Sequence, residues 1–301
     1  MWPSAYYRRS SITEYSFSVG VGVAYTAEIS RSNPGCFVFL VDQSASMSDA
    51  IGGSEVLQRK ADVVSDAINR LLTELSIKCA KEEGVRDYFH VAVVGYGHHV
   101  GSAYGGSLAS RDLVPLSEVA DSPAEVQERA KKVPDGAGGL VETTASFPIW
   151  MYPIANGGTP MVAALRHAHR LVSGWLEAHP SSFPPIVLNL SDGESTDGDP
   201  SATASELTTL ASADGGLLLF NLHVSSIGGA PVEFPDSDLT LTDRYAKLLF
   251  AISSPLPEHM RTYAASQGKQ VSEATRGFVY NADISAVVQF LDIGTRASDL
   301  R

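Results

Sequence analysis

Short, uninterrupted apolar runs alternate along the chain with longer segments in which apolar residues recur at helical spacing. Buried strands are predicted at 36–41, 88–94, 186–190, 217–224 and 277–280. Helices are predicted at 55–79, 160–178, 202–213, 243–252, 257–266 and 284–291. Strands that are apolar on both faces and alternate with helices are typical of a mostly parallel sheet covered by helices on both sides. The pattern therefore predicts a doubly wound α/β fold.

Two of these helices have cap residues that fix where they are expected to begin. Ser54 follows a glycine pair and has the hydroxyl side chain favoured at an N-cap, so the helix at 55–79 is expected to start there. Thr159 is the expected N-cap of the helix after it, because proline, here Pro160, is favoured at the first helical position.

Three motifs rich in side-chain oxygen lie far apart in the sequence: Asp42 to Ser46, Gly157 to Thr159 and Ser191 to Gly193. The first and third come directly after predicted buried strands, and the second precedes a predicted helix. Open α/β sheets bind ligands where the carboxyl ends of their parallel strands meet. We therefore expect the three motifs to form one site. Its candidate residues are Asp42, Ser44, Ser46, Thr159 and Asp192.

The side chains of these motifs favour a hard metal ion. Two carboxylates and three hydroxyls, without His or Cys, suit Mg²⁺, Mn²⁺ or Ca²⁺ and suit Zn²⁺ poorly. If the hydroxyls bind directly and one or both carboxylates bind through water, an octahedral ion keeps at least one position open. Two aspartates only neutralise a divalent ion, so the ion stays attractive to a further carboxylate. The motifs predict a magnesium-type site completed by an Asp or Glu of a partner.

Asp-x-Ser-x-Ser after the first strand, Gly-Gly-Thr before a helix and Ser-Asp-Gly after a later strand together resemble a von Willebrand factor A domain with an intact metal-ion-dependent adhesion site. The resemblance covers all five candidate ligands, and the order of the predicted elements matches from about 34 to 294. It implies a Rossmann-like fold and metal-dependent binding of a protein partner without catalysis. Cytoplasmic bacterial members often act as adaptors beside MoxR-type AAA+ ATPases, or beside protein kinases and phosphatases, in stress and defence systems. The resemblance therefore implies a partner of one of these kinds.

One large domain is expected, because 301 residues with 44% hydrophobic composition suffice for a single α/β core and are tight for two. Residues 34–294 are expected to form this domain. An alternating polar and apolar stretch within residues 1–33 predicts strands added at a sheet edge, and residues 295–301 are expected to form a tail.

The segment 98–156 resembles the family least and is expected to be an insertion. A strand is predicted at 113–116 and a short helix at 123–132, and Gly and Pro elsewhere predict surface loops leading to the metal edge. Partner specificity is expected to reside here. Three aromatic side chains near its end could anchor a partner or pack the insertion onto the domain, and packing is the interpretation we favour. They are Phe147, Trp150 and Tyr152.

Composition excludes several classes of function. A formal net charge of −12 without a basic block argues against nucleic-acid binding, because phosphates would be repelled. No apolar run reaches the roughly 18 residues of a membrane span, and the first residues lack the apolar segment of a secretory signal. Cys36 and Cys79 lie outside any CxxC pair, which indicates two reduced thiols. Together these features favour a cytoplasmic protein that does not enter a membrane.

Two other functions remain open. An exported adhesion or matrix-binding domain would be supported by a disulfide or a longer secreted precursor. A metal-dependent phosphohydrolase would use Asp42 as nucleophile, but such enzymes carry an acid or base two residues later, where this chain has Ser44. The glycine pairs do not match a nucleotide-binding loop, and the spacing of the histidine pairs does not favour a zinc site.

Overall fold

The computed structural model describes residues 25–52, 58–134, 139–226, 230–241 and 243–294. Its centre is a mixed sheet of eight strands in the order β13-β14-β12-β9-β1-β4-β5, with β6 also paired to β4. The parallel strands are β1 (Gly35–Asp42), β4 (Phe89–Tyr96), β9 (Ile186–Ser191), β12 (Leu218–Val224) and β14 (Phe278–Ala282). The antiparallel strands are β5 (Val100–Ser102), β6 (Leu113–Pro115) and β13 (Val232–Glu233). The prediction of a mostly parallel sheet is confirmed.

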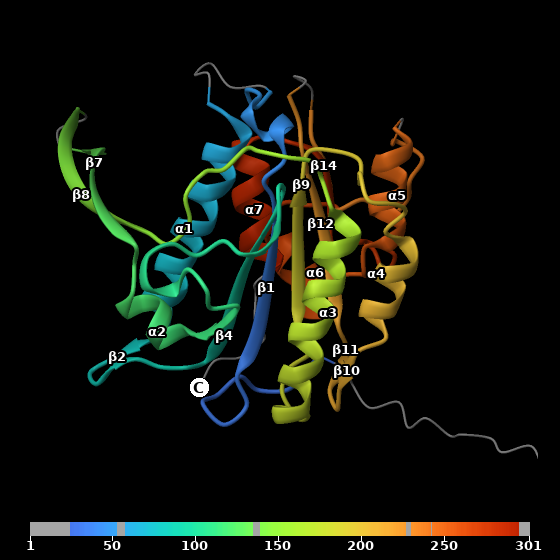
Figure 1. Ribbon diagram of the computed structural model, residues 1–301, viewed down its shortest axis with the longest axis horizontal. Helices are drawn as coiled ribbons and strands as arrows, with labels where there is room; N and C mark the ends of the chain where they lie inside the picture. The colour runs from blue at the N-terminus through green and yellow to red at the C-terminus, as the bar shows by residue number, and fades with distance from the viewer. Residues whose placement is uncertain (1–24, 53–57, 135–138, 227–229, 242, 295–301) are drawn as a thin grey trace, which may run out of the picture.

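The order of the strands reverses between β1 and β9. After β1 the chain builds outward through β4 to β5 and β6, and it then returns to β9 and builds the other way through β12 and β14. β1 and β9 pair in parallel from Phe37 with Ile186 to Val41 with Leu190. Their carboxyl ends therefore lie side by side, at the upper edge of the sheet in Figure 1. This reversal is the position at which open α/β sheets bind ligands.

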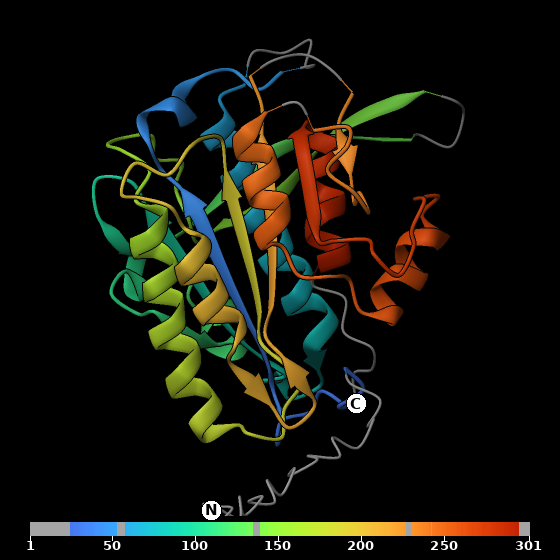
Figure 2. The ribbon, with the colours of Figure 1, turned by 90° about the vertical axis from the view of Figure 1, so that its right-hand side faces the viewer.

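Helices cover both faces of the sheet (Figure 2). One face carries α1 (Lys60–Cys79), α2 (Leu116–Asp121), α6 (Glu258–Ser266) and α7 (Ile284–Gly294), and the other carries α3 (Met161–Ala178), α4 (Ser201–Thr208) and α5 (Arg244–Ile252). Alternate residues of β1 enter the two cores, which explains why its apolar run is uninterrupted. They are Phe37, Phe39 and Val41 on the α1 side and Cys36, Val38 and Leu40 on the α3 side.

The two cysteines are both buried and free. Cys36 belongs to the core on the α3 side of the sheet, whereas Cys79, at the end of α1, belongs to the core on the other side. The sheet therefore separates the thiols, in agreement with the prediction that they do not form a bridge. In the described part of the chain, none of the helices has the length and apolar character needed to span a bilayer.

Several boundaries differ from the predictions. α1 begins at Lys60 rather than near residue 55, because Arg59 is extended and bridged to Ala50. The expected cap Ser54 lies outside the described residues. α4 ends at Thr208 rather than at residue 213. A short hairpin follows α4, and another follows α1. These are β10 (Ala211–Ser212) with β11 (Gly215–Gly216), and β2 (Ala80–Lys81) with β3 (Gly84–Val85).

The two ends of the chain are described only in part. The expected edge strands within residues 1–33 fall mainly on residues 1–24, which lie outside the described residues, and residues 25–33 form no extended strand. The expected tail at 295–301 also lies outside them.

The insertion is more regular than the expected loops and contains a projecting hairpin. The helix predicted at 123–132 is wrong, since β7 (Glu125–Pro134) pairs along its whole length with β8 (Leu140–Ile149). Its charged residues gave no sign of a strand, and pairing with β8 overrides their local propensity. Figure 1 shows this hairpin extending away from the body beside α1. Two other elements of the segment, β5 and β6, extend the main sheet.

One buried amide fastens the base of the hairpin to α1. The Oδ1 atom of Asn69 accepts hydrogen bonds from the backbone N–H groups of Trp150 and Met151, at 2.9 and 3.0 Å. Its Nδ2 atom donates to the Met151 carbonyl at 2.9 Å. Because Asn69 is only 1% exposed, water cannot replace these three bonds.

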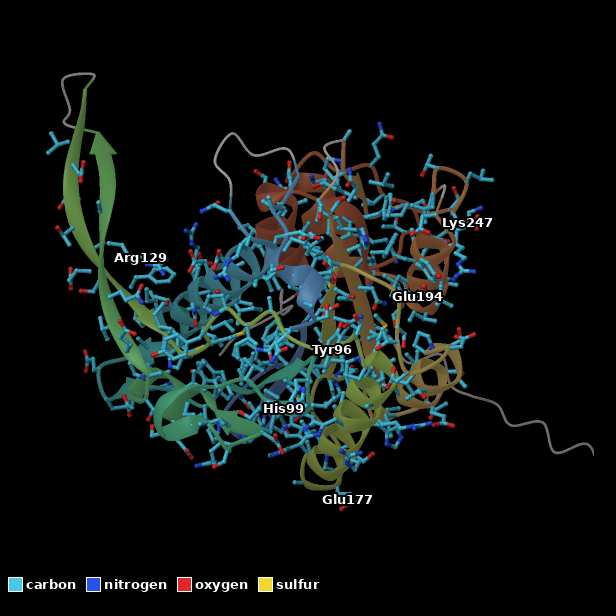
Figure 3. All side chains as sticks on the ribbon, turned by 45° about the horizontal axis from the view of Figure 1, so that its top comes forward. Tyr96, His99, Arg129, Glu177, Glu194 and Lys247 are labelled. Carbon is cyan, nitrogen blue, oxygen red and sulfur yellow. The ribbon has the colours of Figure 1, made fainter. Side chains whose placement is uncertain are left out.

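The aromatic residues of the insertion divide between packing and exposure. Trp150 is buried, and its indole N–H donates to the Val119 carbonyl at 2.6 Å. Phe147 is half-buried under the guanidinium of Arg129, which lies 3.9 Å from the ring centre on the hairpin labelled in Figure 3. Tyr152 is 41% exposed. Packing onto the domain is therefore confirmed for Trp150, which belongs to the main core. Phe147 contacts Arg129 of its own hairpin, and Tyr152 faces solvent.

Replacing the anchoring amide is expected to destabilise the whole domain. Asn69→Leu keeps the approximate volume but leaves two backbone N–H groups and one carbonyl buried without partners, so the free energy of unfolding should fall by roughly 2–5 kcal/mol. Urea denaturation followed by circular dichroism measures this change. Lys78→Leu, on the exposed side of the same helix, is the control and should change stability by less than about 0.5 kcal/mol. Equal midpoints for the two variants would contradict the assignment.

Candidate metal centre

The two predicted aspartates end neighbouring strands. Asp42 is the last residue of β1, and Asp192 directly follows β9. Since these strands pair in parallel, both side chains lie at the edge where the strand order reverses. Figure 3 turns this edge toward the viewer, with Tyr96, the last residue of β4, near its middle. The fold thus brings together two motifs that lie far apart in the sequence.

Hydrogen bonds join four of the five predicted residues into one cluster. Asp42 accepts from the backbone N–H of Ser44 and from the hydroxyl of Ser191, both at 2.8 Å. The hydroxyl oxygens of Ser44 and Ser46 lie 3.0 Å apart. The Ser46 hydroxyl donates to Oδ1 of Asp192 at 2.8 Å. Asp42 and Ser44 are buried, whereas Ser46 is exposed and opens the cluster to solvent.

The fifth residue, Thr159, lies in a loop that backbone hydrogen bonds hold beside the first motif and the loop after β9. Its backbone N–H donates to the Thr196 hydroxyl and its carbonyl accepts from the Thr196 N–H, both at 2.9 Å. The Gly157 carbonyl accepts from the Ala45 N–H at 3.0 Å. Gly157 has a φ of +92°, and a Cβ atom there would lie 2.5 Å from the His98 nitrogen, so only glycine fits. The second motif is therefore held against the first motif and against the loop that follows the third.

The start of α3 shows a role that the sequence reasoning missed. Asp197 accepts hydrogen bonds from the N–H groups of Val162 and Ala163, at 3.0 and 2.9 Å, and so satisfies the first turn of the helix. The prediction that Thr159 is the N-cap is wrong, because the helix begins only after Pro160 and a distant side chain supplies the cap. The acidic loop after β9 thus fastens α3 as well as carrying Asp192.

A second missed residue is Lys60, the first residue of α1. Its ammonium nitrogen lies 2.7 Å from Oδ2 of Asp192 and 3.3 Å from the carbonyl oxygen of Ser46. The side chain is 5% exposed, and that of Asp192 is fully covered. Periodicity could not reveal this contact, because it predicted a helix that began five residues earlier and did not distinguish Lys60 from a solvent-facing lysine.

Beneath the site, a chain of buried polar groups crosses the sheet. The Tyr96 hydroxyl donates to Asn189 at 2.7 Å, and the Asn189 amide donates to Asn221 at 3.0 Å. Asn221 donates to the Ser253 hydroxyl at 2.9 Å, and Ser253 donates to the Leu249 carbonyl of α5 at 2.7 Å. The chain connects β4, β9 and β12 directly below the edge that carries the two aspartates.

The donor atoms fit a hard divalent ion. Neighbouring oxygens around an octahedral Mg²⁺ with bonds of about 2.1 Å lie about 3.0 Å apart, and the hydroxyl oxygens of Ser44 and Ser46 are separated by 3.0 Å. Oxygen is the only ligand element in the cluster. Among the residues that the structure describes, no group of three or more His, Cys, Asp or Glu side chains could hold a metal ion.

Burial raises the pKa of Asp42 to about 6, and the neighbouring negative charge of Asp192 adds to this effect. The hydrogen bonds from Ser44 and Ser191 act in the opposite direction. Burial therefore outweighs the hydrogen bonds, and a positive charge beside Asp42 would relieve the penalty.

The sequence matches no known family model and no curated protein. Among solved structures, the chain is similar to a von Willebrand factor type A protein from Catenulispora acidiphila, with a TM-score of 0.45 and 13% identity over 88% of this chain and 43% of that one. It is also similar to the PilB minor pilin from Streptococcus sanguinis, with a TM-score of 0.43 and 10% identity over 87% of this chain and 61% of the pilin. The chain thus spans less than two thirds of either protein. The fold itself is α/β, a mostly parallel sheet between two helix layers.

Without divalent ions, Asp42 is expected to make the folded chain less stable as the pH rises. Its pKa is about 6 in the folded chain, against an ordinary value of 3.8. The folded state therefore holds this proton more tightly, so the stabilising contribution is complete below about pH 4 and is lost as the pH rises through about 6, on the order of 3 kcal/mol.

Melting temperatures measured in EDTA between pH 4 and pH 7 test this expectation. Asp42→Asn should remove this part of the pH dependence. Asp121→Asn, which changes an exposed carboxyl group, should keep the wild-type profile. If Asp42→Asn and the wild type show the same profile, the buried carboxyl group is not its source.

Proposed function

We propose that this chain is a metal-dependent protein-interaction module, in which a Mg²⁺-type ion held by the five predicted residues accepts a carboxylate from a partner protein. The observation that carries the proposal is the continuous cluster of Asp42, Ser44, Ser46 and Asp192 at the reversal of strand order. Such a cluster is all oxygen, has two negative charges, and is open to solvent at Ser46.

Each residue has a distinct part in this proposal. Asp42 and Asp192 supply the negative charge that attracts a divalent ion, while Ser44, Ser46 and Thr159 supply neutral oxygen atoms. The backbone bonds between Thr159 and Thr196 hold the second loop in place. A bound Mg²⁺, Mn²⁺ or Ca²⁺ would provide a Lewis-acidic position for an acidic side chain. The two aspartates only balance the charge of the divalent ion. The ion would therefore still attract the carboxylate of a partner.

The proposal includes no catalysis. Hydrolysis at this edge would need a general acid or base beside Asp42. The position two residues later is Ser44, whose hydroxyl cannot serve as that acid or base. A second metal would need further carboxylate or imidazole groups, and the described residues gather no such group. The phosphohydrolase alternative therefore has less support than binding.

The proposed setting is the bacterial cytoplasm, where the chain would be an adaptor in a multi-protein stress or defence system. The resemblance of the three motifs favours a MoxR-type AAA+ ATPase, or a protein kinase or phosphatase, as the partner. Two buried, separated thiols agree with a reducing compartment. An exported adhesion domain remains the alternative, and it would use the same metal chemistry on an extracellular protein.

The first expected outcome is that the purified chain binds one divalent ion. Isothermal titration calorimetry with Mg²⁺ and Mn²⁺ should give one site for the wild type and no binding for Asp42→Ala, because half of the ligand charge is lost. Asp121→Ala, which removes a carboxyl group from the exposed surface, should bind as the wild type does. Loss of binding in both variants, or in neither, would contradict the assigned ligands.

The second expected outcome concerns the partner. The tagged chain is used for affinity capture from its native lysate in Mg²⁺ and in EDTA, with Asp42→Ala and Asp121→Ala in parallel. A partner should be retained only when metal and Asp42 are both present. Retention under all conditions would show that docking does not use the metal centre. Turnover of a generic phosphate ester that disappears in Asp42→Ala would favour the phosphohydrolase instead.

A further inference from the structure

Lys60 is a buried lysine that the proposed binding function does not use. Its ammonium group lies between Oδ2 of Asp192, at 2.7 Å, and the carbonyl oxygen of Ser46, at 3.3 Å. Lysine is rarely buried unless it is paired, and this side chain is only 5% exposed. Both of its inner partners belong to the metal motifs, so the lysine is a component of the site.

The position of Lys60 in α1 makes this pairing more significant. Lys60 is the first residue of the helix, and the amino-terminal end of a helix carries partial positive charge. A lysine there is disfavoured by the partial positive charge of the helix end. The favourable interaction that holds the charge inside is therefore the one with Asp192.

A second carboxylate lies on the outer side of the same ammonium group. Oδ2 of Asp49 is 3.8 Å from the Lys60 nitrogen, and the Asp49 side chain is 61% exposed. Lys60 thus has an inner, buried partner and an outer, exposed one. A small movement of a flexible four-carbon side chain would exchange the first for the second.

We propose that Lys60 is an internal competitor that occupies Asp192 when the metal centre is empty and moves toward Asp49 when a divalent ion binds. This inference rests on the proposed metal-dependent function and adds a regulatory element to the same site. Asp42 and Asp192 carry two negative charges, so a lysine ammonium and a divalent ion together exceed them, and the two cations repel each other at short range. The lysine therefore lowers the affinity for metal. When no metal is bound, it provides the counter-ion that the buried Asp192 carboxylate needs.

Mn²⁺ titration of purified variants tests the competition, with calorimetry as the readout. Lys60→Met keeps the length of the side chain and removes its charge, so the dissociation constant for Mn²⁺ should fall by about tenfold or more. Lys78→Met, on the exposed surface of the same helix, should leave it unchanged. Equal or weaker Mn²⁺ binding by Lys60→Met would overturn the proposal.

Thermal melting supplies a second readout that does not depend on affinity. In EDTA, Lys60→Met should melt at a lower temperature than the wild type, because Asp192 is left buried without its counter-ion. Saturating Mn²⁺ should then raise its melting temperature by more than it raises that of the wild type. An equal rise in both proteins would overturn the competition.

A double-mutant cycle tests the outer partner. Asp49→Asn should weaken Mn²⁺ binding when Lys60 is present, because the lysine then has no alternative to Asp192. The same substitution should have a smaller effect in the Lys60→Met background, and the difference measures the coupling. Equal effects in both backgrounds would overturn the exchange. If neither the wild type nor Lys60→Met binds Mn²⁺, the proposed metal function fails, and the competition fails with it. If both bind Mn²⁺ tightly and equally, only the competition is refuted.

Discussion

Because β1 and β9 run in the same direction and pair in register, the ends of both strands arrive at one edge of the sheet. That pairing is what places Asp42 beside Asp192. A slip of one residue would turn the side chains of a strand to the opposite face, and apolar contacts on both faces of β1 oppose such a slip. Packing in the core therefore sets where the two strand ends meet, and the loops that follow them supply the other side chains of the site.

The free-energy cost of burying charge accounts for much of the detail around this edge. Asp42 receives a backbone N–H and a serine hydroxyl, and Asp192 receives Ser46 and Lys60, so each carboxylate has two partners. These bonds do not fully offset burial, since the pKa of Asp42 remains raised. Because the negative charge of Asp42 is only partly stabilised, this site favours a bound cation more than two exposed surface carboxylates would.

The parts of the fold that follow from local pattern could be read from the sequence. Apolar runs located the parallel strands, and three motifs located four residues that the structure joins directly. The errors arose where a distant segment decides the outcome. A hairpin partner turned the predicted helix at 123–132 into β7, and Asp197 rather than Thr159 caps α3. The partner of Lys60, Asp192, lies in the distant loop after β9. None of these contacts leaves a periodic signal near the residue it governs.

The hairpin of β7 and β8 has a mechanical consequence. At about 3.3 Å per residue, strands of ten residues reach about 30 Å from root to tip. The root is held to α1 by Asn69, and the ion pair of Arg129 with Asp66 holds β7 to α1 halfway along its length. The part beyond Arg129, about 16 Å long, acts as a lever, so a rotation of about 10° there would displace the tip by about 3 Å. Small adjustments in the packing of α1, the helix that also carries Lys60, would thus be magnified at a point far from the metal edge.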